Sequence, residues 1–143
     1  MTVKSRHVAL ASQAMITTAT GRSCGYGTLP APTAQPTGAT LPYSVLYEMG
    51  VESSGPAFGD MHADARVVVQ VTSAAASPEM ASAHADTVRA GFLGRIGNRW
   101  AYEITPGSCV VIDRDLDADD GMSSAGSVYS YVQRFALTVT TVG

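Results

Sequence analysis

The C-terminal segment from Val128 to Val142 alternates between apolar and polar side chains. A period of two over so long a stretch predicts a strand with one face packed in a core and the other in water. Such one-sided strands favour an antiparallel or mixed sheet over a fully buried parallel one. The expected packed face holds Tyr129, Tyr131, Phe135, Leu137 and Val139, and the expected wet face holds Ser130, Arg134, Thr138 and Thr140.

Other segments show the same alternation and are expected to be strands. Two of them begin at Pro42 and at Arg66, and the stretch from Trp100 to Arg114, with a turn at Pro106–Gly107, predicts one or two more. In the first segment the expected packed face holds Tyr43, Val45, Tyr47 and Met49, with Ser44 and Glu48 opposite. In the second, Val67, Val69 and Val71 share one face.

A helix-start signal stands at Ser77–Pro78–Glu79. Serine caps free N–H groups, proline fits the first turn, and glutamate favours the positive end of the helix dipole. The helix that follows is expected to stop at Gly94 and Gly97 and to pack through Met80, His84, Val88, Phe92 and Ile96. A shorter helix is expected from Ser5 to Thr18, with Val8, Ala11, Met15 and Thr18 on one face.

These elements follow the order α-β-β-α-β-β and predict one α+β domain over residues 1–143. We expect a mainly antiparallel or mixed sheet with the two helices packed on one face. A length of 143 residues is enough for one core but hardly for two. The expected connections are a Pro-rich surface loop over 28–40, a long flexible turn from Gly50 to Asp60, and an acidic, mobile loop over 113–126.

Charge and hydropathy exclude several classes of protein. Nine Lys and Arg against 12 Asp and Glu give a net charge of −3, which argues against a broad basic surface for nucleic acid. No apolar run approaches the roughly 20 residues of a membrane helix. The first residues lack a secretory signal, so we expect the protein to stay where it is made. Cys24 and Cys109 are too few and too far apart for a disulfide framework or a zinc site, and we expect reduced thiols.

Asp60, His62 and Asp64 alternate at the start of a strand and therefore share one face. A divalent metal could use them, but three ligands from one strand leave an open coordination shell. No second His or Cys cluster in the sequence completes that shell. The favoured interpretation is a solvated strand start, and a metal site is the alternative.

Five carboxylates lie close together at Asp113, Asp115, Asp117, Asp119 and Asp120. They are similar to a calcium-binding loop, but the register fails. Counting from Asp113 places Ala118 at the glycine position and Ser124 at the closing glutamate position. The pattern therefore excludes an EF-hand and leaves only weak divalent binding open. We expect a hydrated loop or, functionally, an acidic surface for a partner or a channel wall.

No motif for nucleophilic catalysis occurs in the sequence. The pattern G-x-S-x-G is absent, and neither cysteine stands in a recognisable signature. Gly25 and Gly27 lack the third glycine of a nucleotide-binding loop. His84 lies on an apolar helix face and is expected to be a packed, hydrogen-bonded core residue rather than a general base. We therefore expect no catalytic residue, no enzymatic activity and no cofactor.

Four segments together resemble the tail terminator (tail completion) proteins of long-tailed bacteriophages, particularly those of phages that infect actinobacteria. The segments are LPYSVLYEM, HADARVVVQVTS running into SPEMASAHADTVRAGFLGRI, WAYEITPGSCVVIDRDLD, and SVYSYVQRFALTVTT. They span most of residues 41–141. None contains a catalytic signature, and the similarity is at the scale of the fold.

This resemblance implies a structural virion protein that assembles into a homohexameric ring. Such a ring sits on the head-proximal end of the tail tube, ends tube polymerisation and offers a docking surface to the head-tail connector or stopper. The implied location is the virion tail, after assembly in the host cytoplasm. The residues expected at these interfaces are Val51, Glu52, Phe58, Asp113, Asp115, Asp117 and Arg134.

Two alternative functions remain open. One is a small α+β domain for binding or hydrolysis that uses Asp60, His62 and Asp64 with a divalent metal. The other is a neighbouring phage part, either a head-tail stopper or a tail tube subunit. A tube subunit also forms hexameric rings, but these rings polymerise.

Overall fold

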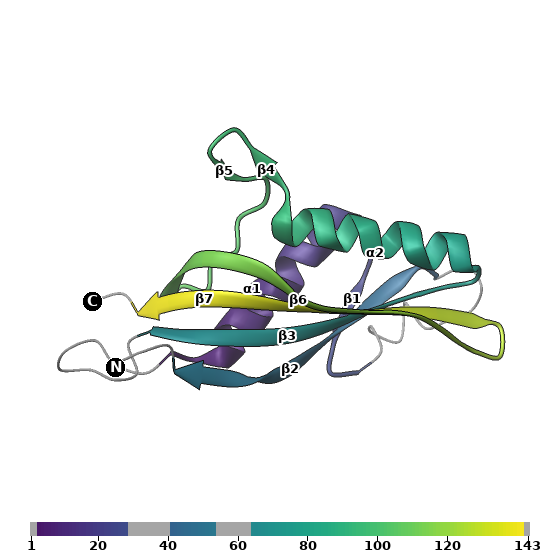
Figure 1. The fold of residues 1–143 in the computed structure, drawn as a ribbon, viewed down its shortest axis with the longest axis horizontal. Coiled ribbons are helices and arrows are strands. Elements are labelled where there is room, and N and C mark those ends of the chain that lie inside the picture. The colour runs from purple at the N-terminus through teal and green to yellow at the C-terminus, as the bar shows by residue number, and fades with distance from the viewer. Residues whose placement is uncertain (1–2, 29–40, 54–63, 142–143) are drawn as a thin grey trace.

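The computed structural model describes residues 3–28, 41–53 and 64–141 (Figure 1). The elements in these ranges are α1 (Ser5–Thr20), β1 (Cys24–Tyr26), β2 (Tyr43–Ser53), β3 (Asp64–Ala75), α2 (Pro78–Leu93), β4 (Arg95–Ile96), β5 (Arg99–Trp100), β6 (Cys109–Ala125) and β7 (Val128–Thr141). Residues 29–40 of the predicted Pro-rich loop and 54–60 of the predicted turn lie outside the described residues. None of the described helices is both long and apolar enough to cross a membrane.

A five-stranded sheet forms one layer of the domain, with the strand order β1-β2-β3-β7-β6. β1 runs parallel to β2, and the other neighbours are antiparallel. Both helices lie on one side, where α1 packs on β1 and β2 and α2 packs on β3, β7 and β6 (Figure 1). The predicted α+β class is therefore confirmed. We call the covered side of the sheet the helix face and the other side the open face.

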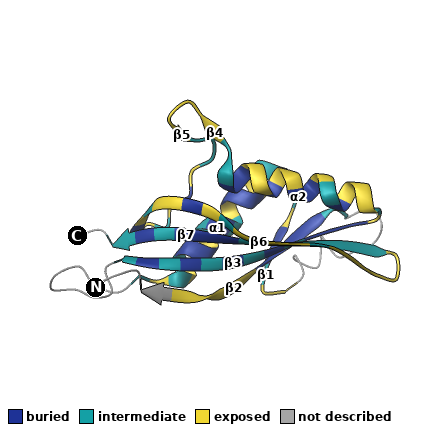
Figure 2. Ribbon diagram, viewed as in Figure 1, coloured by how far each residue is buried: buried dark blue, intermediate teal, exposed yellow. Residues whose placement is uncertain are grey.

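The register of the two central strands places their predicted apolar sets on the helix face. Val67 of β3 lies opposite Leu137 of β7. Val69 lies opposite Phe135, and all these side chains are fully buried. Phe92 of α2 stacks on Phe135 with ring centroids 4.1 Å apart. This stack joins the helix layer to the centre of the sheet, where the buried segments of both layers meet (Figure 2).

α2 begins as the sequence predicts. Ser77 Oγ accepts a hydrogen bond from the Met80 backbone N–H at 3.2 Å, and Pro78 occupies the first turn. The helix ends at Leu93, so Ile96 lies beyond the packed stripe, and Met80 is also exposed. The side chains that pack are Ala81, His84, Ala85, Val88 and Phe92.

α1 continues past the predicted end to Thr20 and stops at Gly21, whose φ of 68° is the left-handed conformation that favours glycine. Of the predicted stripe, Val8 and Met15 are buried and Thr18 is exposed. The packed side of the helix is rotated toward Ile16, because that residue shares the buried face with Val8 and Ser12.

The face of β2 that packs against the helices is the opposite of the predicted one. Leu46 is fully buried on the helix face, whereas Tyr47 is exposed on the open face. The pairing with β3 decides this, because each rung of the ladder directs both side chains to the same side. Tyr43 and Val45 are buried nevertheless, since they pack with Ala74 on the open face.

The predicted acidic loop over 113–126 is wrong, because most of this segment is strand. β6 pairs antiparallel with β7 from Cys109 to Ala125, and the turn is confined to Gly126 and Ser127. Repulsion among the carboxylates favours a loop only in the absence of a partner strand, and pairing with β7 satisfies the backbone of β6. Three register shifts interrupt the ladder, and the carboxylates are exposed to water, where their repulsion is screened.

Of the one or two strands predicted between Trp100 and Arg114, the part after the turn at Pro106–Gly107 is confirmed as the start of β6, and the alternating segment from Trp100 to Ile104 is not a strand of the main sheet. Only β5 (Arg99–Trp100) is extended, and it pairs with β4 (Arg95–Ile96) in a two-stranded hairpin outside the main sheet. Gly97, with a φ of 64°, and Asn98 form its turn. The hairpin projects from the end of α2 away from the sheet (Figure 1).

Replacing Phe92 by Ala should lower the free energy of unfolding by about 3–5 kcal/mol, because it removes a fully buried ring and leaves a cavity against Phe135. Met80→Ala on the same helix is the matched control. Since Met80 is 45% exposed, its truncation should cost less than about 1 kcal/mol. Urea unfolding of both variants measures the difference, and equal losses would contradict the central position of Phe92.

Candidate functional site

The open face brings together several of the predicted interface residues. Arg134 of β7 lies opposite Gln70 of β3, and Arg134 Nε donates a hydrogen bond to Gln70 Oε1 at 3.2 Å. Asp115 of β6 follows on the next rung of the same face, opposite Ala136, and Asp113 follows on the rung after it. Both carboxylates are exposed. The open face therefore presents a cation and two anions on neighbouring rungs.

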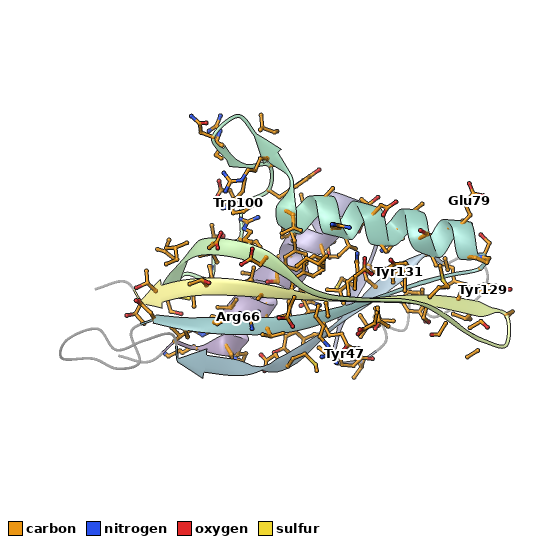
Figure 3. All side chains as sticks on the ribbon, in the orientation of Figure 1. Tyr47, Arg66, Glu79, Trp100, Tyr129 and Tyr131 are labelled. Carbon is orange, nitrogen blue, oxygen red and sulfur yellow. The ribbon has the colours of Figure 1, made fainter. Side chains whose placement is uncertain are left out.

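An ion pair crosses this face from β3 to β6. Arg66 Nη2 lies 2.5 Å from Asp117 Oδ1, and the two side chains are 35% and 29% exposed (Figure 3 labels Arg66). Asp117 stands at a register shift, and the extra residue lets its carboxylate reach over β7. A pair so exposed contributes about 1 kcal/mol or less to stability. Arg66 was not among the predicted interface residues, because only the register brings it to Asp117.

Of the remaining predicted interface residues that the structure describes, Glu52 shares the open face and Val51 does not. Val51 is exposed, but it pairs with Val67 and therefore belongs to the helix face at the far end of β2. Glu52 lies in β2 opposite Arg66. Phe58 lies outside the described residues. The predicted set is thus divided between the two faces of the sheet.

The alternative metal site is described only in part. Asp64 begins β3 opposite Thr140, whereas Asp60 and His62 lie outside the described residues. Within the ranges that the structure describes, no group of three or more His, Cys, Asp or Glu side chains gathers closely enough to hold a metal ion. The metal alternative stays a prediction.

His84 is packed in the core, as the sequence predicts. It is 6% exposed, and its Nε2 lies 3.3 Å from Ser44 Oγ. Burial lowers the pKa of His84 to about 4, and the positive charge of Arg22 acts in the same direction. The imidazole is therefore neutral at neutral pH. An open hollow of about 320 Å³ lies beside it, lined by Thr20, Arg22, Pro42, Met80, Ala83, His84 and Thr87.

In the part of the chain that the structure describes, neither Ser44 beside His84 nor either cysteine is an activated nucleophile. Ser44 is fully buried. Burial raises the pKa of the Cys24 thiol to about 11, so the thiolate is not populated at neutral pH. Burial also raises the pKa of Cys109, and both cysteines are free. The contact between Ser44 and His84 instead ties α2 to β2.

Sequence reasoning missed the hairpin of β4 and β5. The guanidinium carbons of Arg95 and Arg114 lie 4.0 Å and 4.7 Å from the centre of the ring of Trp100, a residue labelled in Figure 3. Arg114 is 5% exposed and donates a hydrogen bond from Nη1 to the Phe92 carbonyl at 3.3 Å. Burial lowers the pKa of Arg114. The Gly97–Asn98 pair was the available signal, since such pairs favour two-residue hairpin turns.

Two exposed surfaces therefore remain as candidate functional sites. One is the open face with edge strand β6, and the other is the β4–β5 hairpin. No family model matches this chain, and no curated protein matches it.

The burial of His84 should make stability depend on pH. Its folded pKa of about 4 lies below the ordinary value of 6.5, so between these values the unfolded chain binds more protons than the folded one. The free energy of unfolding should therefore rise by up to about 3 kcal/mol as the pH rises from about 4 to about 6.5. Above that range this contribution should be constant.

The variant His84→Gln separates this effect from the titration of other groups. Glutamine keeps a hydrogen-bonding group near Ser44 but does not titrate. Urea unfolding across the same pH range should show a weaker pH dependence for the variant than for the natural chain. Parallel profiles would mean that His84 is solvated in the folded protein.

Proposed function

We propose that this protein is a structural, non-enzymatic subunit of a long-tailed phage virion that caps the head-proximal end of the tail tube. Copies of the chain form a ring, which by the resemblance described above is a homohexamer. The ring ends tube polymerisation and gives the head-tail connector or stopper a surface to dock on. This role uses no catalytic residue and no cofactor.

The observation that carries the proposal is the one-sided covering of the sheet. α1 and α2 cover one face, while the open face and edge strand β6 carry exposed side chains (Figure 2). Tyr47 of β2 and Val110 of β6 are exposed apolar residues on open-face rungs, and Ile112 is exposed at a register shift of β6. Uncovered faces and free edges of this kind are typical of a protein that works in contact with other proteins.

A cap for a polymer needs two unlike surfaces. Tube polymerisation is head-to-tail, and it continues until something binds one end without regenerating the same edge. In this chain the helix layer and the open face present different chemistry on the two sides of one sheet. These two sides support a ring that binds tube protein on one side and the connector on the other.

We assign the contacts to the sheet rather than to loops. Sequence reasoning gave them to the turn from Gly50 to Asp60 and to the segment 113–126. The turn is described only as far as Ser53. The second segment is mostly strand β6, so its carboxylates stand on a hydrogen-bonded frame. Charges held in fixed positions select partners better than charges on a mobile loop.

The purified protein should form closed rings rather than monomers of 14.8 kDa. The free edge of β6 and its exposed apolar side chains provide the area for this association. Light scattering on a size-exclusion peak gives the mass, and negative-stain imaging shows whether the assembly is closed. A strict monomer, both alone and with tail tubes, would contradict ring formation. Open-ended polymers would identify a tube subunit instead.

Virus particles assembled without this protein should carry tails of abnormal length or tails that are not joined to heads. Adding the purified protein should restore joining. Arg134→Glu reverses a charge on the open face and should restore joining poorly, whereas Arg89→Glu at an exposed position of α2, on the helix side of the sheet, should restore it fully. Electron microscopy of the particles measures both effects. Normal tails attached to filled heads in the absence of the protein would exclude the proposed function.

A further inference from the structure

The β4–β5 hairpin carries an apolar tip between two cations. Ile96 is 67% exposed, more than any other large apolar side chain that the structure describes. Arg95 and Arg99 lie on either side of it in sequence, and both are exposed. Arg99 makes no ion pair with any residue in the described ranges. Burial of Ile96 and pairing of Arg99 therefore require a surface that the hairpin does not reach within the described part of its own chain.

The hairpin is held firmly at its base. Trp100 lies against the guanidinium groups of Arg95 and Arg114. Arg114 is buried and is in turn hydrogen-bonded to the end of α2. A side chain on a fixed support loses little conformational entropy on binding, so its contact area contributes more to affinity. This favours docking of the hairpin as a preformed element.

A matching surface lies along edge strand β6. Val110 and Ile112 are 46% and 55% exposed, and they are followed by the exposed carboxylates Asp113 and Asp115. β6 is the last strand in the sheet order, so its outer edge has no neighbour among the described strands. Its charges and register shifts disfavour pairing with another strand edge. The apolar side chains and carboxylates of this edge instead fit a docking element that carries an apolar side chain flanked by cations.

One copy of the chain cannot join these two surfaces. Asp113 and Asp115 project from the open face. The hairpin rises on the helix side (Figure 1), and its Trp100 contacts Arg114, which lies on a helix-face rung opposite Leu137. The sheet therefore separates the arginines of the hairpin from the carboxylates of the same chain. A second copy offers the missing surface.

We propose that the β4–β5 hairpin of one copy docks on the β6 edge of the next copy. Ile96 packs on Val110 and Ile112, while the two arginines of the hairpin pair with Asp113 and Asp115. The contact joins two different surfaces, so it is heterologous and can be repeated around a ring. The inference rests on the proposed ring and assigns the surfaces that hold it together.

Charge reversal tests this contact without removing the Trp100 stack. Arg99→Glu and Asp115→Arg should each weaken self-association about tenfold or more, because an attraction becomes a repulsion. A mixture of the two variants should associate like the natural chain, since every hairpin then meets an edge of opposite charge. The double variant should also associate by itself. Analytical ultracentrifugation measures all four samples.

Arg89→Glu and Asp86→Arg are the matched controls. They make the same changes of net charge at exposed positions of α2, outside the hairpin and outside the Val110–Asp115 segment of β6. Both should leave association unchanged. If Arg99→Glu and Asp115→Arg also leave it unchanged, the hairpin contact is overturned while the ring stands. If the natural chain forms no ring even on tail tubes, the proposed function fails and this contact fails with it.

Cross-linking gives a second measurement that also detects a weak contact. Chains with Ile96→Cys and chains with Ile112→Cys should be joined by a short bismaleimide only after the two are assembled together. The natural thiols are buried and should react slowly. Met80→Cys, placed on the exposed start of α2, replaces Ile112→Cys in the control. Equal cross-linking to both positions would overturn the proposed contact.

Discussion

The antiparallel pairing of β3 with β7 is the interaction on which the other packing depends. It runs from Asp64 opposite Thr140 to Ala75 opposite Tyr129 without a register shift. Because side chains alternate along a strand, an unbroken register sends one continuous apolar set to the helix face. α2 packs on that set through Phe92. A slip of one residue would place charged and polar side chains under the helix instead.

Signals that are local in sequence predicted most of this fold. β3 alternates over most of its length and β7 over its second half except at Ala136, and Ser77 caps α2 through residues next to it, so neither required knowledge of a partner. The packed face of β2 and the strand at 113–125 were wrong for the opposite reason. Leu46 is buried because its rung of the ladder places it on the side that the helices cover. β6 is extended because a long strand runs beside it.

The candidate site was predictable in residue type but not in arrangement. The carboxylates of β6 stood out as a cluster, but only the register shows that Arg66 reaches Asp117 and that Arg134 shares their face. Phe58, Asp60 and His62 lie outside the described residues and stay predictions. The hairpin was missed because its strands are two residues each, too short for any periodic pattern.

Arg114 connects the hairpin to the stability of the whole domain. Its Nε has no hydrogen-bond partner among the described residues, and the guanidinium is held by the Trp100 ring and the Phe92 carbonyl. A buried cation with so few partners makes the folded state sensitive to whatever covers it. By thermodynamic linkage, a partner that binds the hairpin only in the folded state raises the free energy of unfolding. The melting temperature of a subunit then reports whether its hairpin is engaged.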